Sequence, residues 1–322
     1  MTPVKYLDAQ ALIDALPWPR LIDALDQIFA REVVEPVRHQ HSIEVPGEPD
    51  ATLLLKPAWI TGAYLGVKQV AVFPGNNARG EPALNSSYVL SCAKTGRPLL
   101  QLDANELTSR RTAAASALAS RYLSRANSST LLMMGAGRMA RTLIQAHCAV
   151  RPIDTVYVWN RSRASADRLI DVLGAQSVNV KNCSDQELPD VAGRADIISC
   201  ATLATEAILH GEWLRPGTHI DLVGSFRADM RETDDETIRK ATIFVDTRAG
   251  ALAEAGDLIQ PMENDVFKPQ DVIAEFSQLC SGQHSGRSQL ANSDEQITLF
   301  KSVGAAREDL AAAILAYDPQ AS

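Results

Sequence analysis

A glycine-rich hexapeptide between a short apolar run and a helical pattern constrains the fold more than any other feature of this 322-residue sequence. Within "LLMMGAGRMA", the residues Gly135, Ala136, Gly137, Arg138, Met139 and Ala140 match the pattern GxGxx(G/A), and "RMARTLIQAHCAV" continues as a helix. The first glycine allows a tight turn, the second lets backbone N–H groups approach a pyrophosphate, and the small last residue lets helix and strand pack closely. The pattern predicts a dinucleotide-binding unit whose cofactor contacts lie at residues 135–139.

Short apolar runs alternate with helical patterns over most of the second half of the sequence. The runs "TVYVWN", "ADIISCA", "HIDLVG" and "TIFVDT" are apolar almost throughout, as strands are when helices cover both faces of a parallel sheet. Together with "TLLMMGAG" they predict a doubly wound, Rossmann-type α/β domain from Ser129 to about residue 290.

The first part of the sequence has a different pattern. A helical stretch, "AQALIDALPWPRLIDALDQIFAREV", precedes strand-like runs such as "ATLLLKP" and "YLGVKQVAVF", which favours an α+β domain up to about Ser109. The alanine-rich segment "LTSRRTAAASALASRYLSR", with Thr108 as its expected N-cap, predicts a helix long enough to connect two domains. The tail from Ile297 to Tyr317 is predicted to be one amphipathic helix, which could close either domain.

The end of the second Rossmann strand bears on the choice of cofactor. An acid about 20 residues after the glycines would bind the 2′-hydroxyl of NAD(H) and repel the 2′-phosphate of NADP(H). This sequence has Asn160 there, followed by Arg161, Ser162 and Arg163, which are donors suited to a phosphomonoester. The segment therefore favours NADPH over NADH, although these residues would also suit the solvated start of a helix.

Composition and charge exclude several other classes of protein. A formal net charge of -8 argues against a nucleic acid or an anionic membrane as partner. The N-terminus lacks a signal-peptide pattern, and no apolar stretch reaches the 18 to 20 residues of a membrane helix, so we expect a cytoplasmic protein. The five cysteines and six histidines form no metal-ligand spacing, so no metal site is predicted.

Four charged residues stand out as candidates for chemistry. Lys68 lies inside an apolar strand pattern, where an ammonium group is costly unless it is paired or used. Arg38 and Arg111 occur in the same predicted domain, and Asp229 follows a predicted strand of the α/β domain, where such sheets bind their ligands. Taken singly, each is more typical of a surface residue, an ion pair or a helix cap.

Several segments resemble the ornithine cyclodeaminase/mu-crystallin family, nearly from end to end. They include "LLLKPAW", "LGVKQVAVFPGN", "ELTSRRTAAASALA", "VWNRSRASA", "HIDLVGSFRADMRETDDE", "VDTRAGALAEAGDL" and "TLFKSVGAAREDLAA". The resemblance implies a substrate-binding and dimerisation domain formed by 1–112 and 296–322, with a Rossmann domain at 113–295 inserted in it. It also implies a homodimer.

The resemblance further assigns roles to individual residues. Arg38, Lys68 and Arg111 would line the substrate site and hold the α-carboxylate, while Asp229 would lie beside the reacting nitrogen. Lys68 could also share the proton transfer with Asp229. Further cofactor contacts would come from Thr202, Val223, Ser225 and Lys301. A carboxylate beside a C=N bond suits such cationic groups, and an acid of tuned pKa can support protonation of the imine.

Three positions depart from the cyclodeaminase pattern and narrow the activity. Leu54 replaces an acid that would hold a distal amine, Asn160 replaces the NAD-type acid, and Lys56 replaces a usual methionine. The leading hypothesis is NAD(P)H-dependent reduction of Δ1-pyrroline-2-carboxylate or Δ1-piperideine-2-carboxylate to proline or pipecolate. The alternatives are ornithine cyclodeaminase, an alanine or N-alkyl amino-acid dehydrogenase, and a mu-crystallin-like binding protein without catalysis.

Overall fold

The computed structural model describes residues 4–174, 178–318 and 320, and its chain forms two compact units. The first unit combines Met1–Thr112 with Ala306–Ser322, and the second is Ala113–Ala305. The predicted α/β class is confirmed, with a Rossmann-type unit inserted into an α+β unit.

The first unit contains a six-stranded sheet in the order β1-β6-β5-β4-β3-β2. β1 pairs with β6 in parallel, and the other neighbours are antiparallel. The strands are β1 (Lys5–Leu7), β2 (His39–Ile43), β3 (Ala51–Ile60), β4 (Tyr64–Val72), β5 (Leu84–Cys92) and β6 (Pro98–Asp103). The helices of this unit are α1 (Ala9–Ala15), α2 (Trp18–Phe29), α3 (Asn76–Arg79) and α12 (Ala306–Tyr317), together with the first half of α4 (Ala104–Leu123).

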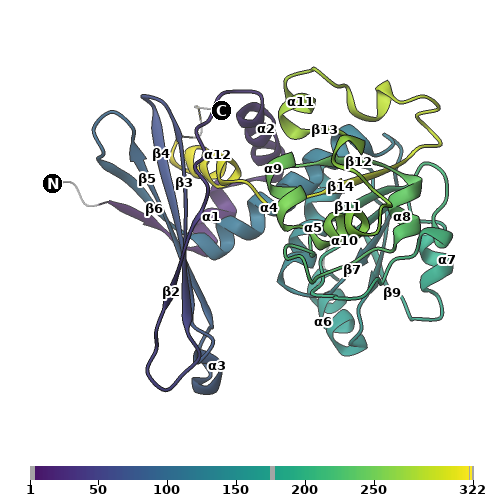
Figure 1. The fold of residues 1–322 in the computed structure, drawn as a ribbon, viewed down its shortest axis with the longest axis horizontal. Coiled ribbons are helices and arrows are strands. Elements are labelled where there is room, and N and C mark those ends of the chain that lie inside the picture. The colour runs from purple at the N-terminus through teal and green to yellow at the C-terminus, as the bar shows by residue number, and fades with distance from the viewer. Residues whose placement is uncertain (1–3, 175–177, 319, 321–322) are drawn as a thin grey trace. The chain divides into compact units, whose positions relative to one another are not determined.

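Helix α12 forms the core of the first unit, where it contacts α2, β3 and β4 (Figure 1). The amphipathic helix α2 buries Leu21, Leu25 and Ile28. In α12, residues 308–315 are all buried, so this helix has almost no solvated face. Its two acids, Glu308 and Asp309, therefore lie in the interior and need cationic partners.

The second unit has an eight-stranded parallel sheet in the order β13-β12-β14-β11-β10-β7-β8-β9. The strands are β7 (Thr130–Met134), β8 (Thr155–Trp159), β9 (Asn179–Asn182), β10 (Ile197–Cys200), β11 (His219–Leu222), β12 (Ala241–Val245), β13 (Val272–Glu275) and β14 (Ile297–Lys301). Between them lie α5 (Arg138–Val150), α6 (Arg163–Leu173), α7 (Leu188–Ala192), α8 (Asp235–Lys240), α9 (Arg248–Glu254), α10 (Gly256–Glu263) and α11 (Phe276–Cys280). The chain order reverses direction between β7 and β10, which is where open sheets of this kind bind ligands.

Strand β14 corrects the prediction for the tail. Ile297–Lys301 is not helical: it pairs in parallel with β11 and β12, and all five residues are buried. Consequently 296–305 belongs to the second unit, and only α12 returns to the first. The chain turns at Gly304, whose φ of 85° is a left-handed conformation that favours glycine.

Helix α4 also begins earlier than predicted. It starts at Ala104, and the Asp103 carboxylate accepts a hydrogen bond from the Glu106 N–H, so Asp103 rather than Thr108 caps the first turn. Thr108 lies inside the helix. Within the part of the chain that the structure describes, no helix is long and apolar enough to cross a membrane.

Candidate active site

The turn after β7 has the geometry that the glycine pattern predicts. Gly135 has a φ of 111°, and a Cβ atom there would lie 2.7 Å from the Ala201 carbonyl oxygen, so a larger residue would be strained and obstructed. Gly137 is the N-cap of α5, and a Cβ at this position would meet nothing within 4 Å. The backbone surface at the start of α5 is therefore open, which suits close approach of a phosphate group.

A pocket of about 330 Å³ lies at this turn, between the ends of β7 and β10. Six of the predicted cofactor residues line it, namely Gly135, Ala136, Gly137, Asn160, Arg161 and Thr202. Sequence reasoning missed Trp159, Leu203 and Ile208, which supply much of its apolar wall. Leu203 is 75% exposed although it is a large apolar residue, and its place directly after a buried strand is a signal that could have found it. The size, position and donor set of the pocket fit a dinucleotide.

Asn160 connects the glycine turn with the segment that follows β8. Its Oδ1 accepts a hydrogen bond from the Ala136 N–H at 3.1 Å, and its Nδ2 donates to the Ser162 carbonyl at 3.0 Å. A second hollow of about 180 Å³ begins here and is lined by Asn160, Arg161, Arg163 and residues 182–186. The Arg163 side chain is 80% exposed and Ser162 is the N-cap of α6, so this hollow has donors available at its rim.

The other predicted cofactor residues lie outside the pocket lining. Arg138 and Met139 form the first turn of α5 and are exposed and half-buried, respectively. Val223, just after β11, is half-buried. Ser225 is fully buried: its hydroxyl donates to the Met230 carbonyl at 2.8 Å and accepts from the Asp257 N–H at 3.0 Å.

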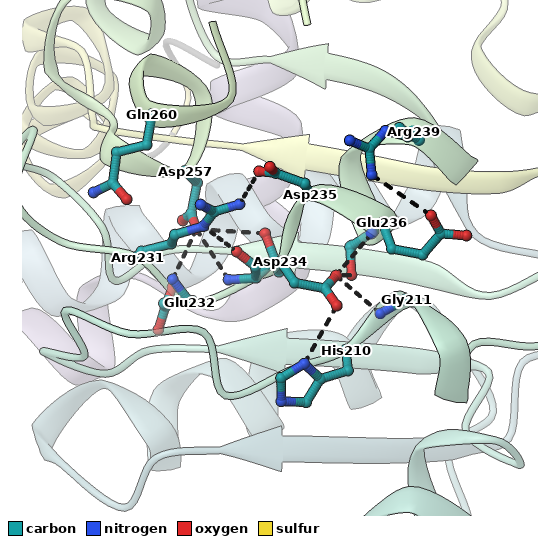
Figure 2. Close-up of polar contacts among 12 residues, drawn as sticks. His210, Gly211, Arg231, Glu232, Asp234, Asp235, Glu236, Arg239, Asp257 and Gln260 are labelled. Carbon is teal, nitrogen blue, oxygen red and sulfur yellow. Dashed lines mark hydrogen bonds and ion pairs between the residues drawn. The ribbon is translucent and has the colours of Figure 1, made fainter. Parts of the chain in front are cut away.

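Lys301 belongs to a buried charged cluster behind Thr202. Its Nζ lies 3.5 Å from the Asp257 Oδ2. The Asp257 Oδ1 accepts a hydrogen bond from the backbone N–H of Glu232 at 2.8 Å (Figure 2). Glu232 Oε1 accepts both the N–H and the hydroxyl of Thr202, at 2.7 and 2.8 Å. Burial and the nearby Asp257 charge raise the pKa of Glu232 to about 7, against the opposing effect of Lys301.

Glu232 also fixes the loop that carries Asp229. Its Oε2 accepts the Gly224 N–H at 2.8 Å, so both ends of the segment 224–232 are held to the buried cluster. Asp229 lies on the exposed part of this loop and forms an ion pair with Arg227 at 2.9 Å, with its side chain 63% exposed. The hydrogen bond from Arg227 lowers the pKa of Asp229, so this carboxyl group is ionised near neutral pH.

The first unit holds a second charged cluster, built on β4, α4 and α12. Lys68 Nζ lies 2.8 Å from the Asp309 Oδ2 and donates to the Thr108 hydroxyl at 3.2 Å. Arg111 donates to Asp309 at 3.0 Å through Nε and to Glu308 at 2.6 Å through Nη1. The exposed fractions of Lys68 and Arg111 are only 3% and 5%, so both predicted functional cations are buried and ion-paired.

Burial and the neighbouring charges tune the pKa values in this cluster. Desolvation, together with the charges of Arg111 and Lys56, lowers the pKa of Lys68 to about 7, although Asp309 opposes the shift. Burial by itself would raise the pKa of Asp309, but the charges of Lys68, Arg111 and Lys56 outweigh it and hold the value at about 2. Lys68 can therefore gain or lose a proton near neutral pH beside a carboxylate that stays ionised.

Sequence reasoning did not find Glu308 and Asp309, although a signal was present. "AREDLAAAILA" is apolar nearly all round its helix, and acids in a helix of that kind must be paired in the interior. Tyr88, opposite Lys68 across β4 and β5, was also missed and is buried at 1% exposure.

Arg38 and Lys56 are electrostatically coupled to the same cluster. Arg38 is an exposed residue directly before β2, and its charge acts on Lys56. Lys56 is half-buried in β3, and desolvation lowers its pKa while the Asp309 carboxylate opposes the change. The charge of Arg38 acts on Lys56, and the charges of Lys56 and Arg111 act on Lys68, so these four cations of the first unit are electrostatically linked. Among the described residues, no group of His, Cys, Asp and Glu side chains is arranged to hold a metal ion.

Comparison with known proteins gives consistent matches over almost the whole chain. Residues 15–322 match the Ornithine cyclodeaminase/mu-crystallin family. A Δ1-pyrroline-2-carboxylate reductase of Colwellia psychrerythraea is 37% identical over 313 residues, which cover 96% of this chain and 97% of that protein. The enzyme of the same name from Paracoccus denitrificans is 36% identical over 296 residues, covering 89% of this chain and 92% of the relative. The structure of Thermococcus litoralis Δ1-pyrroline-2-carboxylate reductase with NADH and L-proline superimposes with a TM-score of 0.85 at 33% identity, covering 98% and 96% of the two chains.

Proposed function

We propose that this chain, which belongs to the ornithine cyclodeaminase/mu-crystallin family, catalyses the NAD(P)H-dependent reduction of a cyclic ketimine carboxylate. The substrate is Δ1-pyrroline-2-carboxylate or Δ1-piperideine-2-carboxylate, and the product is proline or pipecolate. The observation that carries the proposal is the buried Lys68, which forms an ion pair with Asp309 and has a pKa of about 7. The same chain has a pocket that suits a dinucleotide.

The cations of the first unit bind the substrate. Arg111 has a guanidinium group held at a fixed angle by Glu308 and Asp309, and a preorganised guanidinium binds a carboxylate in a defined orientation. Arg38 contributes a second positive charge from the start of β2. Together these groups select an imine that carries a carboxylate next to the C=N carbon.

Lys68 and Asp229 act in the protonation of the imine nitrogen. Reduction adds a hydride to the imine carbon and a proton to the nitrogen; the nicotinamide, when bound, supplies the hydride. Protonated Lys68 donates the proton to the imine nitrogen, which its pKa of about 7 allows at neutral pH. Asp229, ionised beside Arg227, stabilises the positive charge on the protonated imine.

NADPH is the preferred cofactor. Support comes from Asn160 in place of an acid and from the exposed donors Arg161, Ser162 and Arg163 around the second hollow. Neighbouring solved structures bind NADH or NAD⁺, which supports a nicotinamide cofactor. Thr202, in the wall of the pocket, contacts the cofactor, whereas Ser225 and Lys301 are buried outside the lining and stabilise the surrounding loops. The working form is a cytoplasmic homodimer.

Replacing Asp229 with Asn tests the assignment directly. The variant keeps a side chain of the same shape but loses the charge that stabilises the iminium, so kcat should fall about 100-fold or more. NADPH binding, followed by fluorescence titration, should change less than about threefold because Asp229 does not line the cofactor pocket. Full turnover in this variant would remove Asp229 from the mechanism.

The alternative activities give different products. Ornithine cyclodeaminase would release ammonia and proline from ornithine, and a binding protein would retain ligand without oxidising NADPH. Leu54 argues against the first, since an apolar side chain offers a distal amine no counter-charge. Lys68, buried beside Asp309 and Arg111, favours catalysis over the second, because buried titratable groups with perturbed pKa values cluster at catalytic sites.

A further inference from the structure

An acidic side chain lines the hollow that the proposed function assigns to the 2′-phosphate of NADPH. This hollow of about 180 Å³ is lined by Asn160, Arg161 and Arg163, which follow β8, and by 182–186 at the end of β9 and just after it. Asp185 belongs to the second segment, so its carboxylate and the two arginines line the same space. A phosphate dianion bound there would be attracted by the guanidinium groups and repelled by the carboxylate.

The side chain of Trp159 holds Asp185 in place. Trp159 is the last residue of β8, and its indole Nε1 donates a hydrogen bond to the Asp185 Oδ1 at 2.8 Å. The segment around Asp185 is also tied down, because the Ser184 N–H and hydroxyl both donate to the Glu187 Oε2, at 3.0 and 2.7 Å. A carboxylate accepts several hydrogen bonds, so the bond from the indole leaves Asp185 able to accept another from a ligand.

The neighbouring charges do not explain Asp185 as a counter-ion of the hollow. Arg163 has an acid on its own helix, since its Nε lies 3.9 Å from the Asp167 Oδ2. The other oxygen of Asp167 accepts a hydrogen bond from the Asn182 Nδ2 at 2.6 Å. The group that holds Asp185, by contrast, is the neutral indole of Trp159. The position of Asp185 is therefore set by a contact that leaves its charge available to the hollow.

A carboxylate in this hollow has opposite effects on the two nicotinamide cofactors. It can accept a hydrogen bond from a ribose 2′-hydroxyl, and it repels a 2′-phosphate. In many dinucleotide-binding folds, an acid after the second strand does this, but here Asn160 follows that strand and its Oδ1 accepts the Ala136 N–H. Asp185 follows the next strand and brings a carboxylate to the same hollow.

We infer that Asp185 is a second determinant of cofactor specificity, which accepts the 2′-hydroxyl of NADH and opposes the 2′-phosphate of NADPH. The inference rests on the proposed function, because it concerns the hollow that the proposal assigns to the cofactor. Asp185 weakens the preference for NADPH that Arg161 and Arg163 create, so the chain can use both cofactors. Trp159 acts through Asp185 as a positioning residue.

Equilibrium binding of NADPH and NADH to the full chain tests the inference without turnover. Fluorescence titrations give the ratio of the dissociation constants, Kd for NADH over Kd for NADPH. Asp185→Asn keeps the shape of the side chain and an acceptor for the Trp159 indole but removes the charge, so this ratio should rise at least about fivefold. The rise should shrink at high ionic strength, because Asp185 is exposed and its charge is screened. An unchanged or lower ratio in Asp185→Asn would overturn the inference.

Two further variants separate the local effect of Asp185 from indirect ones. Asp171→Asn removes an exposed acid from α6, away from the hollow lining, and should change the ratio less than about twofold. Trp159→Phe removes the hydrogen bond to Asp185 and should raise the ratio in the wild-type background. In the Asp185→Asn background the same change should alter the ratio less than about twofold, since the two residues act together. Equal effects of Trp159→Phe in both backgrounds would overturn its positioning role.

Turnover separates this inference from the proposed function. Reduction of Δ1-pyrroline-2-carboxylate with the same ratio of kcat/KM for NADPH and NADH in the wild type and Asp185→Asn would contradict the inference and leave the reductase assignment intact. The expected rise in the binding ratio, in a protein that reduces neither Δ1-pyrroline-2-carboxylate nor Δ1-piperideine-2-carboxylate, would support the role of Asp185 and overturn the proposed function.

Discussion

Replacing Asp309 with Asn removes the charge on which the buried cluster of the first unit depends. The carboxylate is fully buried and contacts both Lys68 and Arg111. Asparagine has nearly the same shape, so the change leaves packing largely intact and isolates the electrostatic effect. Two cations then remain in the interior with Glu308 as their neighbouring acid.

The lowered pKa of Asp309 indicates how much folding stability the Asp309→Asn variant should lose. A fall from the usual 3.8 to about 2 corresponds to about 2 kcal/mol in favour of the ionised form in the folded protein. Because the folded-state pKa is lowered, this stabilisation is present above pH 3.8 and is lost as the pH falls through about 2. Removing one partner of a buried ion pair costs about 3–5 kcal/mol, so the free energy of unfolding at pH 7 should fall by about 2–5 kcal/mol.

A second effect of Asp309→Asn concerns the proton on Lys68. Asp309 raises the pKa of Lys68 against burial, so its removal should lower that pKa further below about 7. Imine reduction requires protonated Lys68 in the proposed mechanism. The alkaline fall of kcat/KM should therefore move to lower pH in the variant.

Urea unfolding of the full chain, followed by tryptophan fluorescence, measures the first effect, and a pH–rate profile measures the second. Trp18 and Trp59 report on the first unit, in which the destabilisation should occur. Glu81→Gln removes an exposed carboxylate of the same unit and serves as the control. A loss of less than about 0.5 kcal/mol together with an unshifted profile would refute the electrostatic reasoning, since surface changes have effects of that size.

Two further predictions concern the second unit. Asn160→Asp keeps an acceptor for the Ala136 N–H but adds a negative charge beside Arg161 and Arg163. This charge would repel a 2′-phosphate, so the ratio of kcat/KM for NADPH to that for NADH should fall at least about tenfold. An unchanged ratio would contradict the proposed 2′-phosphate contacts. Wild-type stability should decrease as the pH rises from 4.5 through about 7, because the folded-state pKa of Glu232 is raised. Glu232→Gln should reduce this pH dependence of the free energy of unfolding, measured by urea titrations at several pH values. The same change should raise the KM for the cofactor, because Glu232 holds Thr202. An equal dependence of unfolding free energy on pH in the two proteins would exclude Glu232 as the titrating group.

The glycine turn shows how far local sequence could predict the site. The positive φ of Gly135 belongs to the tight turn itself, and Gly137 is the helix N-cap two residues later, so a pattern of six consecutive residues was enough to find both. The pairing of Lys68 with Asp309 joins residues 241 positions apart, and no local pattern contains that information. Burial of Lys68 in a strand pattern indicated only that some partner had to exist.

The tail of the sequence shows where periodicity is ambiguous. "ITLFK" is a short apolar run, and such a run cannot be assigned to a helix or a strand by its pattern alone. Its position between β11 and β12 is decided by tertiary pairing, which buries all five residues on both faces of the sheet. Lys301 is the last residue of this strand, so its buried contact with Asp257 depends on the same tertiary pairing.

Initial rates with Δ1-pyrroline-2-carboxylate, measured side by side with NADPH and NADH, test the central claim most directly. We expect oxidation of one NADPH for each proline formed, with a higher kcat/KM for NADPH than for NADH. Absence of imine reduction with either cofactor, together with ammonia and proline formed from ornithine, would contradict the account and identify the chain as a cyclodeaminase.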